Sequence, residues 1–179
     1  MEQRVAVTDR MGLEVVECPP ERLSEMYRLR ATVWIHEGAD PASFPDGEWR
    51  EPRDASRLHW IAIDKGRVVA TASLSLHAEL ADVEEGHVYL EANLSSPGPI
   101  AAPARLTIAP EYRGGGLVRA LLDAQDAAAT DAGATLAVRQ ASPSLRPMLA
   151  RRGWMAHGAG PIDPRFPVLF TVMSLRLPR

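Results

Sequence analysis

The feature that most constrains this chain is a strand, a turn of three successive glycines and a helix, placed one after another in its second half. Arg105–Ala109 has the apolar, β-branched character of a strand. Leu117–Ala132 carries an apolar stripe at helical spacing, and Gly133 is a natural end for that helix. The next apolar run, Thr135–Gln140, is a strand. A strand, helix and strand in this order predict a locally parallel pair joined by a right-handed crossover.

The glycine turn between the first strand and the helix has the composition of a phosphate-binding loop. Glycines adopt positive φ and let the backbone approach a ligand closely. The first N–H groups of a helix lack partners, and the macrodipole is positive there, so the turn predicts a diphosphate pocket. Arg113 and Arg119 can add charge-assisted hydrogen bonds. An ordinary glycine-rich loop is the alternative. A P-loop and a dinucleotide site are excluded, because neither the Lys-Ser/Thr pair nor the G-x-G-x-x-G spacing is present.

The remaining patterns predict an α/β (α+β) fold with a mixed central sheet and helices on both faces. Further strands are expected at residues 13–18, 58–63, 67–77, 154–157 and 168–177, with a hairpin turn at Lys65-Gly66, and further helices at residues 20–38 and 144–152. Residues 39–57 are polar and proline-containing, which indicates a long loop. Within residues 78–104 we expect a short helix over Glu79–Glu85, a strand over His87–Glu91 and a loop over Ser95–Pro103.

Composition limits the classes of function. The 179 residues, 46% hydrophobic and 24% charged, suit a single domain over residues 1–179. A formal net charge of −3 gives no basic excess for nucleic-acid binding. No apolar run approaches the roughly 20 residues of a membrane span, and the polar start is unlike a signal peptide. The lone Cys18 excludes an internal disulfide framework, so we expect a reduced, cytoplasmic setting. High Ala, Arg, Gly and Pro usage suggests a bacterial, GC-rich source.

The stretch Ile108–Leu122, IAPEYRGGGLVRALL, resembles the central motif of the GNAT family of acyl-coenzyme A-dependent N-acyltransferases. That motif has Arg or Gln, two free residues, Gly, one free residue, and then Gly or Ala. Arg113, Gly116 and Val118 occupy those places, and Val118 departs from the small residue expected. The strand at residues 67–75 and the helix ending in Arg-Arg-Gly-Trp at Trp154 also resemble the family, so the resemblance covers nearly the whole chain.

The resemblance implies that acetyl-CoA, or coenzyme A after the reaction, is bound as co-substrate. It implies transfer of an acetyl group to a primary amine of a small molecule or peptide by direct attack on the thioester. The pyrophosphate would lie on the turn and helix start, formed by Arg113, Gly114, Gly115, Gly116, Leu117 and Val118. A backbone N–H of the motif strand, from Leu106, Thr107 or Ile108, would bind the thioester carbonyl oxygen.

The catalytic side chains are less constrained by the sequence. The family's usual general acid is a tyrosine, and Leu149 stands at that position. Ser142 is a nearby candidate for the acid, with Tyr112 and His157 as weaker ones. Candidates for the base are Glu37, at the end of the first helix, and His59, because an imidazole titrates near neutral pH. A solvated helix end and a structural histidine are the alternative interpretations of these two residues.

Three classes of protein fit these patterns: an N-acyltransferase, a GNAT-fold acyl-CoA-binding or regulatory module with weak catalysis, and an acyl-homoserine-lactone-synthase-like enzyme. The acidic residues of the loop 39–57 could attract a cationic acceptor, or the loop could simply be solvated. No His, Cys, Asp and Glu set has metal-site spacing, so no metal is expected. The sequence leaves open whether the protein forms a homodimer. The resemblance makes one possible, because the final strands often mediate pairing of subunits in the family.

Overall fold

The computed structural model describes residues 7–8 and 12–178. The chain divides into two compact units, one from Met1–Ser73 with Arg105–Ala127 and one from Leu74–Ala104 with Ala128–Arg179. Strands β4 (Arg67–His77) and β5 (Ile100–Ile108) and helix α3 (Leu117–Asp131) each run from one unit into the other. The predicted strand, glycine turn and helix are therefore present, with β5 beginning earlier than expected.

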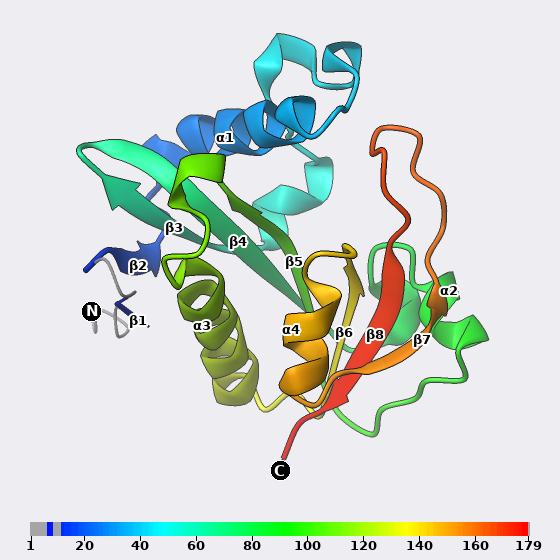
Figure 1. Ribbon diagram of the computed structural model, residues 1–179. Helices are drawn as coiled ribbons and strands as arrows, with labels where there is room; N and C mark the ends of the chain where they lie inside the picture. The colour runs from blue at the N-terminus through cyan, green and yellow to red at the C-terminus, as the bar shows by residue number, and fades with distance from the viewer. Residues whose placement is uncertain (1–6, 9–11, 179) are drawn as a thin grey trace. The chain divides into compact units, whose positions relative to one another are not determined.

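In the first unit the strands follow the order β1 (Val7–Thr8), β2 (Glu14–Glu17), β3 (Leu58–Asp64), β4 and β5 (Figure 1). The pairs β1–β2 and β2–β3 are antiparallel. Lys65 and Gly66 both have positive φ, 48° and 80°, between β3 and β4. Two left-handed residues match the twist of a tight hairpin, so the predicted turn is confirmed.

Helices cover both faces of the sheet in this unit, because successive strand residues point to opposite sides. Ala62 of β3 packs in a core cluster with Leu121 of α3. The preceding residue, Ile61, packs in another cluster with Met26 and Tyr27 of α1 (Leu23–His36). Helix α1 continues a 3-10 turn, η1 (Pro20–Arg22), which places a proline in the first turn as expected.

The second unit contains a mixed sheet in the order β4, β5, β6 (Leu136–Ala141), β8 (Thr171–Arg176) and β7 (Met155–Ala159). Strand β6 is parallel to β5, with Ile100 opposite Leu136, and antiparallel to β8. Strand β7 pairs antiparallel with β8. Helix α4 (Arg146–Arg151) lies between β6 and β7 in the sequence. The parallel β5–β6 pair is the one predicted from the crossover through α3.

Three predictions between β4 and β5 differ from the structure. His87–Glu91, predicted as a strand, is helix α2. Its β-branched and aromatic residues favour a strand locally, but Val88 and Tyr89 are buried in a core cluster with Ile100, and this packing overrides the local preference. The predicted loop Ser95–Pro103 ends early, because Ile100 already pairs with Leu136. The predicted helix over Glu79–Glu85 is reduced to a 3-10 turn, η5 (Leu80–Asp82).

The long loop after α1 is built from three proline-initiated 3-10 turns: η2 (Pro41–Ser43), η3 (Pro45–Gly47) and η4 (Pro52–Ser56). Its aromatic side chains point inward. Phe44 and Trp49 are buried, and Trp49 contacts the ring of Trp34 from α1 at 6.3 Å between ring centroids. The loop is therefore a packed part of the first unit, with its own apolar contacts.

Candidate active site

The glycine turn joins β5 to α3 through the 3-10 turn η6 (Pro110–Tyr112). Gly114 and Gly116 have φ of 84° and 107°, which side chains with a Cβ rarely adopt. The Ala120 N–H donates to the Gly116 carbonyl oxygen, so the helix begins directly at the turn. The N–H groups before that first helical bond are those that bind anions at helix starts.

Side chains of the turn tie it to other parts of the first unit. Arg113 Nη2 lies 2.7 Å from Glu37 Oε1, and Arg113 Nε lies 3.4 Å from the Ile108 carbonyl oxygen. Glu37 is the C-cap residue of α1. The Tyr112 hydroxyl donates to Asp64 at 2.7 Å, a bond that raises the pKa of the tyrosine. Two residues predicted for different roles, Arg113 for phosphate and Glu37 for the base, are therefore ion-paired.

Strand β5 is irregular just before the predicted carbonyl donors. Arg105 has φ of 56°, in the left-handed region that a residue with a side chain enters at a cost of about 1–3 kcal/mol. Its guanidinium carbon lies 4.6 Å from the centre of the Trp49 ring. Leu106 is half-buried, and Thr107 and Ile108 are buried. Backbone irregularities in strands commonly mark functional positions, where they redirect backbone and side-chain groups.

His59 is buried, and both of its ring nitrogens have partners. Nε2 lies 2.9 Å from the Asp54 carbonyl oxygen, and Nδ1 lies 3.2 Å from Arg30 Nη2. Because a guanidinium only donates, Nδ1 accepts and Nε2 carries the proton. Burial lowers the pKa of His59, so the ring is held neutral. This arrangement leaves neither nitrogen open to a substrate.

The same histidine belongs to a buried ionic cluster. Arg30 Nη1 lies 3.2 Å from Asp54 Oδ1, and Arg57 Nε lies 4.0 Å from the same oxygen. All three of these side chains are at most 2% exposed. Asp54 also accepts from the Glu51 N–H, which closes a capping box at the start of η4. Through its carboxylate and its backbone carbonyl oxygen, Asp54 therefore links α1, β3 and the loop between them.

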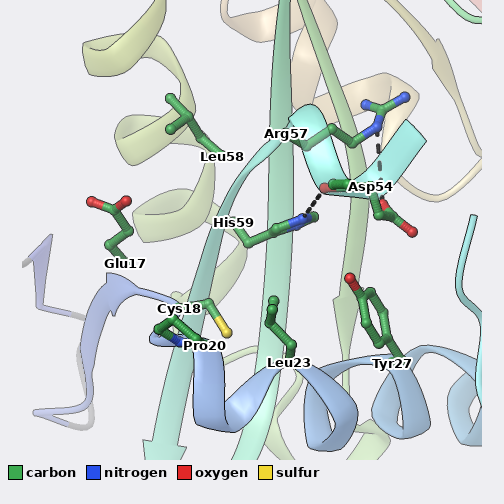
Figure 2. A pocket seen from close by; sticks show the side chains of 10 residues that line it. Glu17, Cys18, Pro20, Leu23, Tyr27, Asp54, Arg57, Leu58 and His59 are labelled. Atoms are coloured by element: carbon green, nitrogen blue, oxygen red, sulfur yellow. Dashed lines mark hydrogen bonds and ion pairs between the residues drawn. The ribbon is translucent and has the colours of Figure 1, made fainter. Parts of the chain in front are cut away.

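A pocket of about 180 Å³ lies beside this cluster (Figure 2). Its lining side chains come from β2, η1, α1, η4 and β3, and they include Glu17, Cys18, Leu23, Tyr27, Arg57 and His59. Burial raises the pKa of the Cys18 thiol to about 11. At neutral pH a thiol with such a pKa is protonated and poorly nucleophilic.

The remaining candidates lie in the second unit. Ser142, directly after β6, exchanges a 3.1 Å hydrogen bond with Ser144. Leu149, at the position of the family's tyrosine, is 0% exposed. His157 shares a 2.7 Å hydrogen bond with Ser174 on the neighbouring strand. The role of Ser142 as general acid remains a prediction. The buried side chain of Leu149 contributes to packing.

Over the described ranges 7–8 and 12–178, no group of three or more His, Cys, Asp or Glu side chains could hold a metal ion. In the same part of the chain, no helix is both long enough and apolar enough to cross a membrane.

Comparison with known proteins identifies the class of this molecule. The profile of the acetyltransferase (GNAT) family matches residues 23–154, which span the first helix, the glycine turn and α4. The chain therefore belongs to the GNAT family, whose members use an acyl-CoA. Among curated proteins, no sequence matches it.

Solved structures share the fold. Polyamine N-acetyltransferase from Drosophila melanogaster is 14% identical with a TM-score of 0.70, over 92% of this chain and 100% of that chain. The CoA-dependent acyl-homoserine lactone synthase BjaI is 18% identical with a TM-score of 0.69, over 89% and 78%. The N-acyl amino acid synthase FeeM, from uncultured soil microbes, is 12% identical with a TM-score of 0.67, over 90% of each chain. The predicted family and fold class are thus confirmed.

Sequence reasoning missed two features of the site. Nothing in the local sequence indicates that Arg30 and Asp54, 24 positions apart, form a buried ion pair. The irregularity at Arg105 is equally hidden, because arginine is a poor marker for positive φ. The one available signal was Pro103, which lacks an N–H and is unusual inside a strand.

Proposed function

We propose that this protein is an acyl-CoA-dependent N-acyltransferase, with acetyl-CoA as donor and a primary amine of a small molecule or peptide as acceptor. The observation that carries the proposal is the turn with positive φ at Gly114 and Gly116 directly before α3, preceded by the irregular strand β5. The turn supplies N–H groups for the pyrophosphate of the donor. The proposed sites are Arg113, Gly114, Gly115, Gly116, Leu117 and Val118 for the pyrophosphate, and Leu106, Thr107 or Ile108 for the thioester carbonyl.

In the proposed reaction the neutral amine attacks the thioester carbonyl carbon. A C–N bond forms, the C–S bond breaks, and the thiolate of coenzyme A leaves and takes up a proton. The backbone N–H near Leu106 stabilises the developing negative charge on oxygen. Among the proposed catalytic residues, Glu37 has an exposed carboxylate that can accept the amine proton once it is separated from Arg113. Ser142 stays as the proposed proton donor to the thiolate.

His59 also stays among the candidates for the base, and its contacts favour the structural alternative. Its neutral ring holds Arg30 and the Asp54 backbone. A histidine in this role supports the site by fixing α1 against β3.

The decisive test is the release of free thiol from acetyl-CoA over a panel of amines, together with calorimetric binding of coenzyme A. We expect coenzyme A to bind and at least one amine to release thiol above the hydrolysis rate. Binding without release by any amine would favour the alternative of a GNAT-fold binding or regulatory module. The buried Leu149 is the observation that keeps this alternative open.

A second candidate is an acyl-homoserine-lactone-synthase-like activity, favoured by the fold similarity to BjaI. The two activities can be distinguished by testing which acceptor and which acyl donor the protein uses. If S-adenosylmethionine supports thiol release and simple amines do not, this candidate replaces the first. Dependence on an acyl carrier protein in place of coenzyme A would have the same meaning.

A further inference from the structure

The pocket beside the Asp54 cluster lies at the opposite end of α1 from the glycine turn. Leu23 and Tyr27, from the first two turns of α1, line it. The helix spans 14 residues, about 21 Å at its usual rise, and its C-cap Glu37 contacts Arg113 of the turn. A ligand in this pocket would therefore be separate from a donor bound at the turn.

The pocket combines aliphatic walls with a rim that is open to solvent. Pro20, Leu23 and Leu58 supply apolar surface from η1, α1 and β3. Glu17, Pro20 and Ala55 are exposed, so a ligand can enter between them. The volume of about 180 Å³ is comparable with the roughly 150 Å³ of a protein cavity that binds benzene. A single ring with one small substituent therefore fits.

The hydroxyl of Tyr27 lies in this pocket without a hydrogen-bond partner. The residue is 6% exposed, and Figure 2 shows its hydroxyl directed from α1 toward His59 and Asp54. Among residues 7–8 and 12–178, no group forms a hydrogen bond with this hydroxyl. A buried polar group that lacks a partner costs about 1–3 kcal/mol. A ligand that bonds to the Tyr27 hydroxyl would recover part of that cost.

The charged side chains at the floor of the pocket are already paired. The Asp54 carboxylate contacts both Arg30 and Arg57, and its carbonyl oxygen lies 2.9 Å from His59 Nε2. An ionised ligand would lose its hydration at this floor with little compensation. The pocket therefore favours a neutral molecule.

The Tyr27 ring is held in place before any ligand arrives. Arg30 and Arg50 lie 5.4 and 5.7 Å from the ring centre. The His59 ring meets it edge-on at 6.4 Å, with 87° between the two planes. Burial raises the pKa of Tyr27, so the hydroxyl stays protonated and can either donate or accept a hydrogen bond. Little ordering of this side chain is needed on binding.

We propose that this pocket binds a small neutral hydroxyl compound of about one ring, such as a phenol. The hydroxyl of the ligand bonds to Tyr27, and its ring packs against Leu23 and Leu58. An apolar cavity with a single well-placed polar group is the usual form of a small-molecule site. The pocket is then a second binding site of the first unit, and it is distinct from the proposed coenzyme A turn.

Phenol and toluene isolate the hydrogen bond, because they differ only in a hydroxyl and a methyl group. Their affinities for the full chain are measured by ligand-observed NMR titration. Tyr27→Phe keeps the ring and removes its hydroxyl. The affinity for phenol relative to toluene should fall about two- to tenfold in this variant, as expected for one hydrogen bond. An unchanged ratio, or no binding of phenol to the wild type, overturns the proposal.

Two further variants locate the ligand. Tyr89→Phe is the matched control, because this buried tyrosine belongs to the second unit and lies outside the pocket. It should leave both affinities unchanged. Leu23→Phe adds volume at the pocket wall and should weaken both ligands. If Leu23→Phe binds phenol and toluene as the wild type does, the ligands lie elsewhere and the proposal fails.

Cys18 offers an independent readout, since the only cysteine of the chain lines this pocket and is partly exposed. Its alkylation by N-ethylmaleimide at mildly alkaline pH is followed by intact mass. Phenol at ten times its Kd should slow the reaction roughly tenfold, because only the unoccupied protein reacts. An unchanged rate places phenol outside the pocket.

The outcome is independent of the proposed function. Phenol should bind whether or not any amine releases thiol from acetyl-CoA. Coenzyme A should leave the affinity for phenol unchanged, because the turn and the pocket lie at opposite ends of α1. Displacement of phenol by coenzyme A would overturn the assignment of two separate sites.

Discussion

Arg30 and Asp54 place opposite charges where neither side chain reaches solvent, and each depends on the other for compensation. Replacing Asp54 with asparagine would leave the Arg30 guanidinium buried and uncompensated. We expect Asp54→Asn to lower the free energy of unfolding by about 3 kcal/mol or more. Urea unfolding measures this. Glu48→Gln, which disrupts the pair with the exposed Arg28, is the control and should cost under about 1 kcal/mol.

His59 gives the protein a defined dependence of stability on pH. Because burial lowers its pKa in the folded state, the unfolded chain takes up a proton that the folded chain excludes as the pH falls below about 6.5. Stability is then lost toward acid, by at most about 1.4 kcal/mol per pH unit from this residue. In His59→Gln, the decrease in free energy of unfolding between pH 7.5 and 5.5 should be smaller than in the wild type. An equal decrease in both proteins would show that the ring is protonated when folded.

At the scale of elements, the pair between Glu37 and Arg113 links the end of α1 to the glycine turn. If the pyrophosphate binds the turn as proposed, it would compete with Glu37 for the Arg113 guanidinium. We expect Arg113→Ala to weaken coenzyme A binding about tenfold. Glu37→Gln should strengthen it by a few-fold at most, because a half-exposed ion pair is worth about 0–1 kcal/mol. Calorimetric titration distinguishes the two, and weaker binding in Glu37→Gln would show that no competition exists.

The turn itself is tested through its backbone. Gly116→Ala places a Cβ at φ of 107° and should weaken coenzyme A binding at least tenfold by shifting the N–H groups. Gly133→Ala is the matched control: this glycine also has a positive φ, 68°, has open space around it, and lies outside the turn. It should lose stability and keep its affinity. Equal affinities in the two variants would contradict an anion site at Gly116.

Some of these elements could be predicted from the sequence and others could not. The β3–β4 hairpin, the glycine turn and α3 were predictable, because Lys65-Gly66 and the apolar stripe from Leu117 act through local physics. Helix α2 was not, because Val88 and Tyr89 become helical through burial against residues distant in the chain. The loop over residues 39–57 gives a second example. From the sequence, its acidic residues were expected to attract a cationic acceptor or to be solvated. In the structure, Asp54 pairs with arginine and Glu51 accepts a hydrogen bond from Trp49.

At the scale of the whole molecule, binding of coenzyme A should raise the stability of the folded protein. A ligand that binds only the folded state adds about 2.7 kcal/mol when present at a hundred times its Kd. We expect coenzyme A to raise the unfolding midpoint, and Gly116→Ala to lose most of that rise at the same concentration. Differential scanning calorimetry provides the measurement. A midpoint that coenzyme A leaves unchanged in the wild type would contradict binding to the folded chain.

The positive φ of Arg105 also has a consequence for how this sequence tolerates change. If variants at this position are selected for folding alone, glycine and asparagine should be enriched over arginine, because they relieve the backbone. If the same library is selected for coenzyme A-dependent acyl transfer, a return of arginine would show that its side chain serves the reaction. A single position at which the two selections rank residues in opposite order would separate the part of this sequence kept for its shape from the part kept for its chemistry.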